Sequence, residues 1–320
     1  MPERVRIALT CGEPSGVGAE VALKALETIK SEDAEFILVG PRMVWARAKA
    51  VISGDDQIDR SIIETPSKPP EWSWGVESPG TAKVAAEAVE LSAKLALEGE
   101  VDAIVTAPLT KSGLASAGRK FPGHTELLGA LCGGAPTMYF AGGNLIVALA
   151  TTHLPLSEVP GKLTRENLAG TIERFNEALS GDLGIKSPRI GLCALNPHGG
   201  EGGLLGCEEQ EVIIPVASKA RAAGVDVDGP IPADTLFHYA REGVYDGVIA
   251  MYHDQGLAPF KMLHFHDGLN ITAGLPIVRT SPDHGTAPDI AGRGIARADS
   301  MVAALKYAIR IANERKKRER

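Results

Sequence analysis

The stretch VIAMYHDQG, residues 248–256, carries an apolar run directly into a group of polar side chains. The run from Val248 to Tyr252 has the length and composition of a strand that is buried on both faces. The next residues, His253 to Gly256, bring an imidazole, a carboxylate and an amide, and a loop is expected there. Buried strands of this kind form parallel sheets, whose carboxyl ends line ligand crevices. The stretch therefore predicts an α/β fold with functional side chains at strand ends.

The same pattern of apolar strand followed by histidine occurs twice more. His153 follows the run 145–150, and His198 follows the run 190–195. Three neutral imidazoles at neighbouring strand ends can hold a divalent cation and leave coordination positions open, as in catalytic metal sites. Zinc or cobalt suits nitrogen ligands better than magnesium does. The alternative is that these histidines are ordinary loop residues whose nitrogens bond to the backbone.

Strands alternate with helices along the whole chain, which predicts a mainly parallel, doubly wound sheet. Strands are expected at residues 4–10, 36–40, 101–106, 137–141, 145–151, 189–195 and 248–252. Helices are expected after the glycine-rich turn at 10–20, from a Ser78 cap to about 97, from a Thr164 cap to about 179, at about 208–223 and from about 300.

A chain of 320 residues exceeds one typical core, so two lobes with a cleft between them are expected. Residues 1–130 and 275–320 are assigned to the first lobe, and residues 131–274 to the second.

The composition indicates a loop-rich enzyme of the cytoplasm that binds neither membranes nor nucleic acids. It is 44% hydrophobic with 36 glycines and 21 prolines, and no apolar run approaches the roughly 20 residues of a membrane span. No signal-peptide core follows the N-terminus. A formal net charge of −7 argues against a nucleic-acid surface, and the basic cluster 316–320 is expected to be a solvated helix end. The cysteines lack CxxC spacing and are expected to be free thiols: Cys11, Cys132, Cys193 and Cys207.

Four motifs stand in order along the chain: GHTE at 123–126, THLP at 152–155, NPHGGE at 196–201 and MYHDQG at 251–256. Together with the segment 270–294 they resemble the 4-hydroxythreonine-4-phosphate dehydrogenase family of vitamin B6 synthesis, over nearly the whole chain. The resemblance implies two α/β/α lobes like those of isocitrate and isopropylmalate dehydrogenases, and a homodimer with the active site at its interface. It also implies one divalent ion per site, zinc, cobalt or magnesium, held by His153, His198 and His253.

Substrate contacts follow from the same resemblance. A phosphate group requires cationic and amide donors, which three of the matching residues supply. The alternative for the lysine and the arginine is a solvated surface. The matching residues are His124, Thr125, Lys261, Asn270 and Arg279.

The segment 283–292 is similar to the adenosine-binding loop of isocitrate and isopropylmalate dehydrogenases. Those enzymes bind NAD without a GxGxxG turn, and the first glycine-rich turn of this chain, residues 10–20, likewise lacks the GxGxxG and GxxxxGK[ST] fingerprints. The similarity implies that NAD or NADP contacts His284, Gly285, Thr286, Ala287 and Asp289.

The reaction implied by the resemblance belongs to pyridoxal phosphate biosynthesis. It is the NAD-dependent oxidation of 4-phosphooxy-L-threonine to 2-amino-3-oxo-4-phosphooxybutanoate, followed by decarboxylation to 3-amino-2-oxopropyl phosphate. Lys111 and a metal-bound water are both candidates for the general base. Oxidation of 4-phospho-D-threonate or 4-phospho-D-erythronate is an alternative, because the same phosphate and metal contacts would serve it. A three-histidine hydrolase and a non-catalytic protein that binds a phosphorylated metabolite are more distant alternatives.

Overall fold

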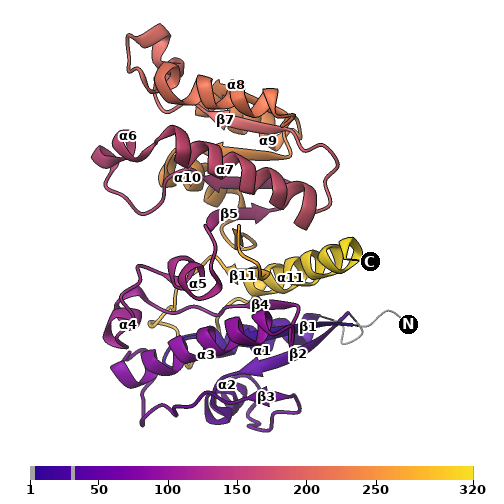
Figure 1. Ribbon diagram of the computed structural model, residues 1–320. Helices are drawn as coiled ribbons and strands as arrows, with labels where there is room; N and C mark the ends of the chain where they lie inside the picture. The colour runs from indigo at the N-terminus through magenta and orange to yellow at the C-terminus, as the bar shows by residue number, and fades with distance from the viewer. Residues whose placement is uncertain (1–3, 30–32, 320) are drawn as a thin grey trace. The chain divides into compact units, whose positions relative to one another are not determined.

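Two compact units make up the chain, whose structure is a computed structural model that describes residues 4–29 and 33–319 (Figure 1). Unit 1 comprises the residues up to Pro136 and from Leu269 onward, and unit 2 is the uninterrupted segment Thr137–Gly268.

Unit 1 is built on a mainly parallel sheet. Each strand runs parallel to its neighbours except β10, which is antiparallel to β11. The three residues of β4 and all but Arg6 of β1 are buried, as expected for strands in the middle of a covered sheet. In order across the sheet the strands are β3 (Ile62–Ile63), β2 (Ala34–Val39), β1 (Val5–Thr10), β4 (Ala103–Val105), β11 (Arg279–Pro282) and β10 (Leu269–Ala273).

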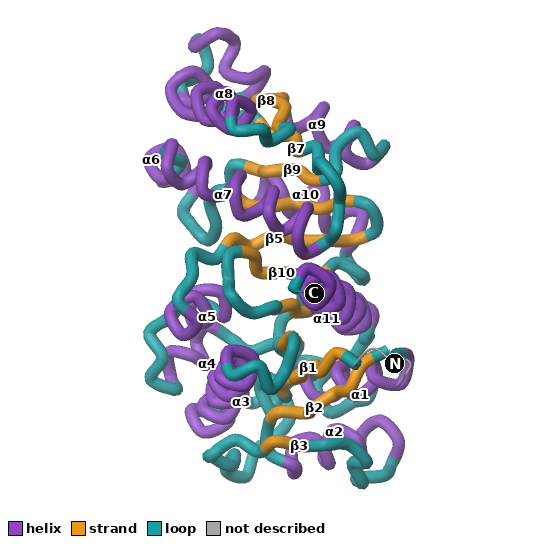
Figure 2. Tube along the Cα trace, turned by 45° about the vertical axis from the view of Figure 1, so that its right-hand side comes forward, coloured by secondary structure: helices purple, strands orange, loops and turns teal. Residues whose placement is uncertain are grey.

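Helices cover both faces of the unit 1 sheet (Figure 2). Helix α3 packs on β1 and β4 from one side, while α11 packs on β4, β10 and β11 from the other and contacts α1. The predicted cap of α3 is confirmed: the Ser78 hydroxyl accepts from the Thr81 amide at 3.2 Å. The helices are α1 (Gly18–Thr28), α2 (Arg42–Ser53), α3 (Pro79–Leu97), α4 (Lys111–Ser116), α5 (His124–Cys132) and α11 (Asp299–Arg318).

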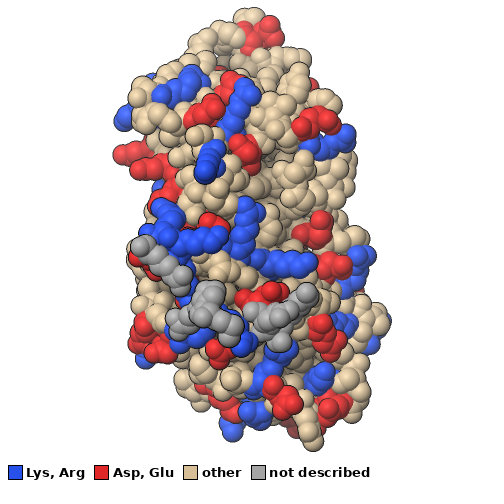
Figure 3. Space-filling model, turned by 90° about the vertical axis from the view of Figure 1, so that its right-hand side faces the viewer, with Lys and Arg blue, Asp and Glu red and all other residues tan. Residues whose placement is uncertain are grey.

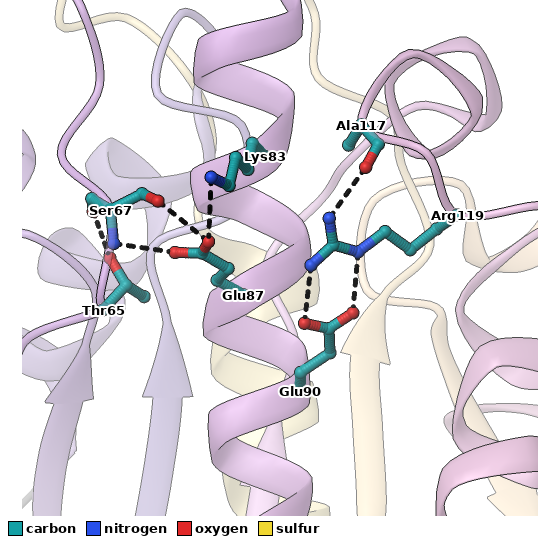
Figure 4. Close-up of polar contacts among 7 residues, drawn as sticks. All are labelled: Thr65, Ser67, Lys83, Glu87, Glu90, Ala117 and Arg119. Atoms are coloured by element: carbon teal, nitrogen blue, oxygen red, sulfur yellow. Dashed lines mark hydrogen bonds and ion pairs between the residues drawn. The ribbon is translucent and has the colours of Figure 1, made fainter.

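Two glutamates on α3 anchor the irregular segments beside it (Figure 4). Glu87 accepts hydrogen bonds from the backbone amide and the hydroxyl of Ser67, both at 2.9 Å. Glu90 accepts from Nε of Arg119 at 2.8 Å and from its Nη2 at 2.9 Å, and Nη1 of Arg119 donates to the Ala117 carbonyl at 2.7 Å. This two-pronged pair holds the turn that leads into α5.

Unit 2 contains five strands that are mainly parallel. In order across the unit they are β5 (Thr137–Gly142), β6 (Leu145–Leu149), β9 (Gly247–Ala250), β7 (Ile190–Cys193) and β8 (Val227–Ile231). Only β5 is antiparallel to its neighbour within this unit's sheet.

Helices flank the unit 2 sheet as well. Helix α7 packs on β5 and β6 and contacts α8, which packs on β8, while α9 and α10 pack on β9. The predicted cap of α7 is confirmed, because the Thr164 hydroxyl accepts from the Asn167 amide at 3.1 Å. The α-helices are α6 (Val159–Lys162), α7 (Arg165–Glu177), α8 (Ile214–Ala222), α9 (Ala233–Arg241) and α10 (His253–His264). The 3₁₀ segments are η1 (Leu156–Glu158) and η3 (Pro197–Gly203), and the π segments are η2 (Ala178–Asp182) and η4 (Glu209–Ile213).

The predicted fold class, α/β with mainly parallel sheets, is confirmed in each unit, but the loop expected after β9 is wrong. Helix α10 begins at His253, and the preceding Tyr252 is extended (φ −146°, ψ 166°). Asp254 lies in the first turn, where a carboxylate favours the positive end of the helix dipole. Leu257 and Phe260, one turn apart, are buried and give this segment an apolar face.

Basic side chains gather at the C-terminal end of α11, with acidic side chains among them (Figure 3). Lys316 Nζ lies 2.8 Å from a carboxylate oxygen of Asp102, and Lys317 Nζ lies 2.6 Å from one of Glu314. The ammonium groups of Lys316 and Lys317 therefore both have carboxylate partners. In the described ranges, no helix combines the length and apolar character needed to cross a membrane.

The four cysteines are free, as predicted, and two of them are buried. Burial raises the pKa of the Cys11 thiol to about 12 and raises that of Cys193 strongly as well. Both thiols are therefore protonated and unreactive at neutral pH.

Candidate functional site

The carboxyl ends of β6, β9 and β7 lie side by side at one edge of the unit 2 sheet. Strand β9 pairs in parallel with β6 on one side and with β7 on the other. The segments that leave these strands at that edge carry His153, His253 and His198, respectively. The fold thus gathers the three histidine-bearing segments, as the strand-end pattern led us to expect.

Two side chains tie these strand ends together. The Thr151 hydroxyl donates to the Met251 carbonyl at 2.7 Å, which joins the segments after β6 and β9. Gln255 accepts from the Met251 amide and donates to the Ala194 carbonyl, both at 2.7 Å, which joins the segments after β9 and β7. These hydrogen bonds connect the three backbone segments that carry the histidines.

Two of the three imidazoles are neighbours. The ring centroids of His153 and His253 are 5.6 Å apart and the rings are inclined by 39°. Nδ1 of His253 lies 2.7 Å from a carboxylate oxygen of Asp254. A carboxylate there favours the tautomer protonated at Nδ1, which leaves Nε2 as the basic nitrogen. Within residues 4–29 and 33–319, no group of three or more His, Cys, Asp or Glu side chains is arranged so that it could hold a metal ion.

Two of these histidines have an unusual backbone conformation. His153 has φ of 23° and His198 has φ of 54°, both in the left-handed region that residues other than glycine rarely adopt. Such conformations cost free energy, persist only where surrounding contacts enforce them, and gather at functional sites.

In unit 1, Arg279 is a buried cation with neutral partners. It is 3% exposed, and burial lowers its pKa to about 10. Its Nε and Nη2 donate to the Thr106 hydroxyl at 3.0 and 2.8 Å, and Nη1 donates to the Thr272 hydroxyl at 3.1 Å. Nη1 also lies 3.5 Å from Oδ1 of Asn270. Across the described part of the chain, no carboxylate lies within ion-pair distance of this guanidinium.

His124 is the first residue of α5 and Thr125, the second, is buried. Burial, reinforced by the positive charge of Arg279, lowers the pKa of His124 to about 3. Its Nε2 is buried and has no hydrogen-bond partner. His124 is therefore a neutral imidazole at physiological pH, with one nitrogen free for a ligand. Asn270 lies in unit 1 with His124 and Arg279, whereas the sequence had assigned it to the other lobe.

The loop 283–292 packs against the first glycine-rich turn of unit 1. The Val17 amide donates to the Thr286 carbonyl at 3.0 Å. A Cβ atom at Gly16 would lie 2.8 Å from that carbonyl oxygen, so only glycine permits this approach. Nδ1 of His284 lies 2.9 Å from the Gly285 carbonyl, and its Nε2 is buried without a partner. Ala287 has φ of 45°.

The segment that follows this loop is held by two residues of α1 that sequence reasoning missed. Glu20 is 2% exposed and accepts from the Ala296 amide at 2.9 Å and from Lys24 at 2.8 Å. Lys24 also donates to the carbonyls of Gly294 and Ala296, both at 2.8 Å. A glutamate four residues before a lysine is typical of an exposed helix face, so the sequence carried no sign of this role.

The two lysines singled out in the sequence lie on helices of different units. Lys111 is the first residue of α4 and is exposed. Lys261 lies on α10 in unit 2 and is partly exposed.

Comparison with known proteins places the chain in a family. The family model described as "Pyridoxal phosphate biosynthetic protein PdxA" matches residues 10–308. A Caulobacter vibrioides protein named 4-hydroxythreonine-4-phosphate dehydrogenase is 43% identical over 327 residues, covering 97% of this chain and 98% of its own. A Bradyrhizobium diazoefficiens protein named "Putative D-threonate 4-phosphate dehydrogenase" is 41% identical and covers 96% of both chains.

A solved structure agrees with these relatives. The crystal structure of 4-hydroxythreonine-4-phosphate dehydrogenase from Klebsiella pneumoniae has a TM-score of 0.82 and 36% identity, covering 98% of both chains. With the fold, the strand-end histidines and the matched length in agreement, the chain belongs to the PdxA family of pyridoxal phosphate biosynthetic proteins.

Proposed function

We propose that this chain is an NAD(P)-dependent and divalent-metal-dependent dehydrogenase of 4-phosphooxy-L-threonine. The secondary hydroxyl is oxidised to give 2-amino-3-oxo-4-phosphooxybutanoate, and loss of carbon dioxide then gives 3-amino-2-oxopropyl phosphate, in pyridoxal phosphate biosynthesis. Family membership supports a dehydrogenase. The observation that carries the substrate class is the buried, unpaired charge of Arg279.

Arg279 supports recognition of an anion. The buried guanidinium has lost its hydration and is bonded only to hydroxyl and amide oxygens, and the negative charge of Glu126, which raises the pKa of Arg279, lies beyond ion-pair distance. A phosphate oxyanion supplies that charge and suits the planar fork of an arginine. The Asn270 amide and the free Nε2 of the neutral His124 add uncharged hydrogen-bonding groups on the same unit. We assign the phosphate end of the substrate to this group, with Thr125 and Lys261 as further contacts.

We assign a divalent metal ion to the three histidines that follow the strands of unit 2. His153 and His253 are adjacent, the Asp254 carboxylate leaves Nε2 of His253 basic, and His198 follows the neighbouring strand β7. Three nitrogen donors suit zinc or cobalt, and substrate oxygens would extend the choice to magnesium. Such an ion would lower the pKa of the substrate hydroxyl and stabilise the charge that develops as carbon dioxide leaves.

The loop 283–292 fits an adenine dinucleotide that accepts the hydride. Its Gly285 and Asp289 are exposed, the Val17 amide bonds to the loop, and Glu20 and Lys24 bond to residues 294 and 296 just after it. We assign cofactor contacts to His284, Gly285, Thr286, Ala287 and Asp289.

Lys111 is proposed to accept the hydroxyl proton. Lys111→Met would then lower kcat and leave KM for the phosphorylated substrate unchanged, whereas unchanged kcat would remove this lysine from the mechanism.

A homodimer with the active site at its interface is also proposed, on the family resemblance. Light scattering during size-exclusion chromatography tests the assembly.

Oxidation of 4-phospho-D-threonate is the second candidate function. The Bradyrhizobium relative and one from Oceanobacillus iheyensis, which is 40% identical, are both named for that activity. The two substrates share the phosphate and the oxidised hydroxyl, and they differ in whether an amine or a hydroxyl lies at C2. The residues described above would serve either substrate.

The test is NADH formation after chelator treatment, with zinc, cobalt or magnesium added back singly and each substrate offered in turn. Metal-restored NADH formation with 4-phosphooxy-L-threonine supports the proposal. Faster turnover of 4-phospho-D-threonate would move the chain to the second function. Absence of NAD binding in calorimetry would instead favour the hydrolase alternative.

A further inference from the structure

We propose that Glu209, a residue with no part in the chemistry above, is a positioning residue that holds the His198 loop in its left-handed conformation and so sets metal affinity. The proposal rests on the proposed role of His198 as a metal ligand. It concerns unit 2 alone, because every residue in the argument lies between Thr137 and Gly268.

Glu209 is buried and bonded to the segment that leads to His198. Its side chain is 1% exposed, a rare state for a carboxylate. Oε1 accepts hydrogen bonds from the backbone amides of Leu195 and Asn196, both at 2.8 Å. Oε2 accepts from Nδ2 of Asn196 at 3.0 Å, and the same Nδ2 donates to Oε2 of the neighbouring Glu208 at 2.7 Å. The carboxylate therefore holds both the backbone and the side chain of the residue two positions before His198.

The loop that follows is a run of left-handed residues. From His198 to Gly202, five consecutive residues have φ between 45° and 77°, and two of them, His198 and Glu201, are not glycines. Left-handed residues normally occur singly, because each non-glycine among them is sterically strained. An enforcing contact is therefore required.

Glu209 supplies that contact on the far side of His198 as well. Gly200 is buried, and a Cβ atom placed on it would lie 2.6 Å from Oε2 of Glu209. The Leu205 amide closes the loop by donating to the Gly200 carbonyl at 3.1 Å. One carboxylate thus contacts the chain before and after His198, and it does so from the first residue of the π segment η4, a type of distortion common at functional sites.

The consequence concerns preorganisation. We call the contacts of Glu209 with residues 195, 196 and 200 the clamp. If the clamp is lost, His198 can relax to the right-handed conformation, which redirects its Cβ and imidazole away from their position at the sheet edge. Residues that orient metal ligands typically change metal affinity about 10- to 100-fold when they are replaced.

The experiment compares Glu209→Gln with Glu211→Gln in the full chain after chelator treatment. Glutamine keeps the side-chain volume and one acceptor oxygen. Its amide nitrogen would face Nδ2 of Asn196, and because both nitrogens are donors, no hydrogen bond can form between them. Glu211 lies on the same π segment with an exposed side chain and is the matched control. The Kd for Co²⁺ is measured by calorimetry, together with the visible spectrum of the bound ion, which reports its ligand geometry.

We expect Glu209→Gln to raise the Kd for Co²⁺ about 10- to 100-fold and to change the visible spectrum. Glu211→Gln should change neither the Kd nor the spectrum. A wild-type Kd and spectrum in Glu209→Gln would overturn the positioning role while leaving the proposed function intact.

If Glu209→Gln does not fold, Asn196→Ala is compared with Glu208→Gln, because Nδ2 of Asn196 donates to Glu208 at 2.7 Å as well as to Glu209 at 3.0 Å. A weaker Co²⁺ complex in Asn196→Ala but not in Glu208→Gln supports the role of Glu209, and an unchanged complex in Asn196→Ala refutes it. If neither the wild-type chain nor His198→Ala binds Co²⁺, the metal site itself fails, and the positioning role fails with it.

Discussion

The two units present their functional groups in different ways. In unit 1, Arg279 lies within a strand and is buried against the hydroxyls of Thr272 on β10 and of Thr106, the residue after β4. In unit 2, His153 and His198 lie on exposed segments beyond the strand ends, in left-handed conformations. The difference shows two ways to preorganise a binding site. Unit 1 removes water from a charged side chain, and unit 2 uses local hydrogen bonds to hold a strained loop.

The two routes have different costs. A desolvated cation destabilises the fold until an anion arrives, whereas a strained loop needs a dedicated clamp but leaves its ligands accessible. Substitutions should therefore affect stability and binding with opposite signs in unit 1, and mainly binding in unit 2.

Replacement of Arg279 by methionine should have the largest effect. We expect kcat/KM for the phosphorylated substrate to fall about 1,000-fold, equivalent to about 4 kcal/mol, because a buried charge-assisted contact is lost. The melting temperature should stay level or rise, because an unpaired buried charge is removed. Initial rates and thermal denaturation test this pair of effects. Arg297→Met, at an exposed arginine paired with Asp299, should change neither, and an unaltered KM in Arg279→Met would refute the phosphate assignment.

Replacement of His253 by alanine comes next. Removal of a ligand should weaken Co²⁺ binding by at least about 100-fold, the upper end of what loss of an orienting partner costs. Stability of the metal-free chain should hardly change, since the His253 side chain is 39% exposed. Calorimetry with Co²⁺ measures the first effect and urea unfolding the second. His266, also exposed, provides the control substitution, and equal Co²⁺ affinity in both variants would exclude His253 as a ligand.

His124, a half-buried residue whose Nε2 is buried, predicts a pH-dependent effect of intermediate size. Its pKa is about 3 in the folded chain, below the ordinary value near 6.5, so the unfolded chain takes up the proton first. The stability that the neutral imidazole contributes is complete above about pH 6.5 and is lost as the pH falls toward 3. We therefore compare the free energy of unfolding of His124→Gln with that of wild type at each pH. The difference should favour the variant by up to about 2 kcal/mol more at pH 5 than at pH 8, at about 1.4 kcal/mol per pH unit below 6.5.

Urea unfolding at pH 5 and pH 8 measures that difference. His238→Gln, at an exposed helical histidine, is the matched substitution and should show no pH-dependent gain. A difference of the same size in both variants would mean that His124 is not held neutral by burial.

The smallest effect is expected from Glu90→Gln. Its partner Arg119 is 23% exposed, and a partly exposed pair of this kind contributes less than about 1 kcal/mol. Urea unfolding should register that loss. Activity should fall only slightly, because Arg119 acts on the turn before α5 rather than on a ligand. Glu98→Gln, in an exposed pair with Lys94, serves as the comparison, and a large loss of activity in Glu90→Gln would show that this turn controls His124.

The strands that the sequence predicted are the ones whose burial makes them apolar, such as β1, β4, β6 and β9. Strand β11 escaped prediction because its residues are buried but polar: the Thr280 hydroxyl donates to the Ala304 carbonyl at 2.8 Å, and Arg279 bonds to Thr106. No local pattern reveals partners so distant in sequence. The start of α10 was missed for a similar reason, because its buried face depends on packing against β6 and β9.

The functional site was likewise predicted from the sequence only in part. The strand-end positions of the three histidines followed from the order of apolar runs, and their role as metal ligands stays a prediction. The Glu20–Lys24 bonds to residues 294 and 296, and the Glu209 bonds to residues 195 and 196, join segments whose meeting is determined only by the tertiary fold.

The division of unit 1 into two separate segments has a consequence for synthesis on the ribosome. Unit 2 is continuous and can fold as soon as Gly268 has emerged, but β4 must wait for β11, its parallel neighbour, which is made more than one whole unit later. Until then β4 presents an open sheet edge, the kind of surface on which chains aggregate. Slow translation beyond Gly268 should therefore favour aggregation of the nascent chain more than slow translation within unit 2 does.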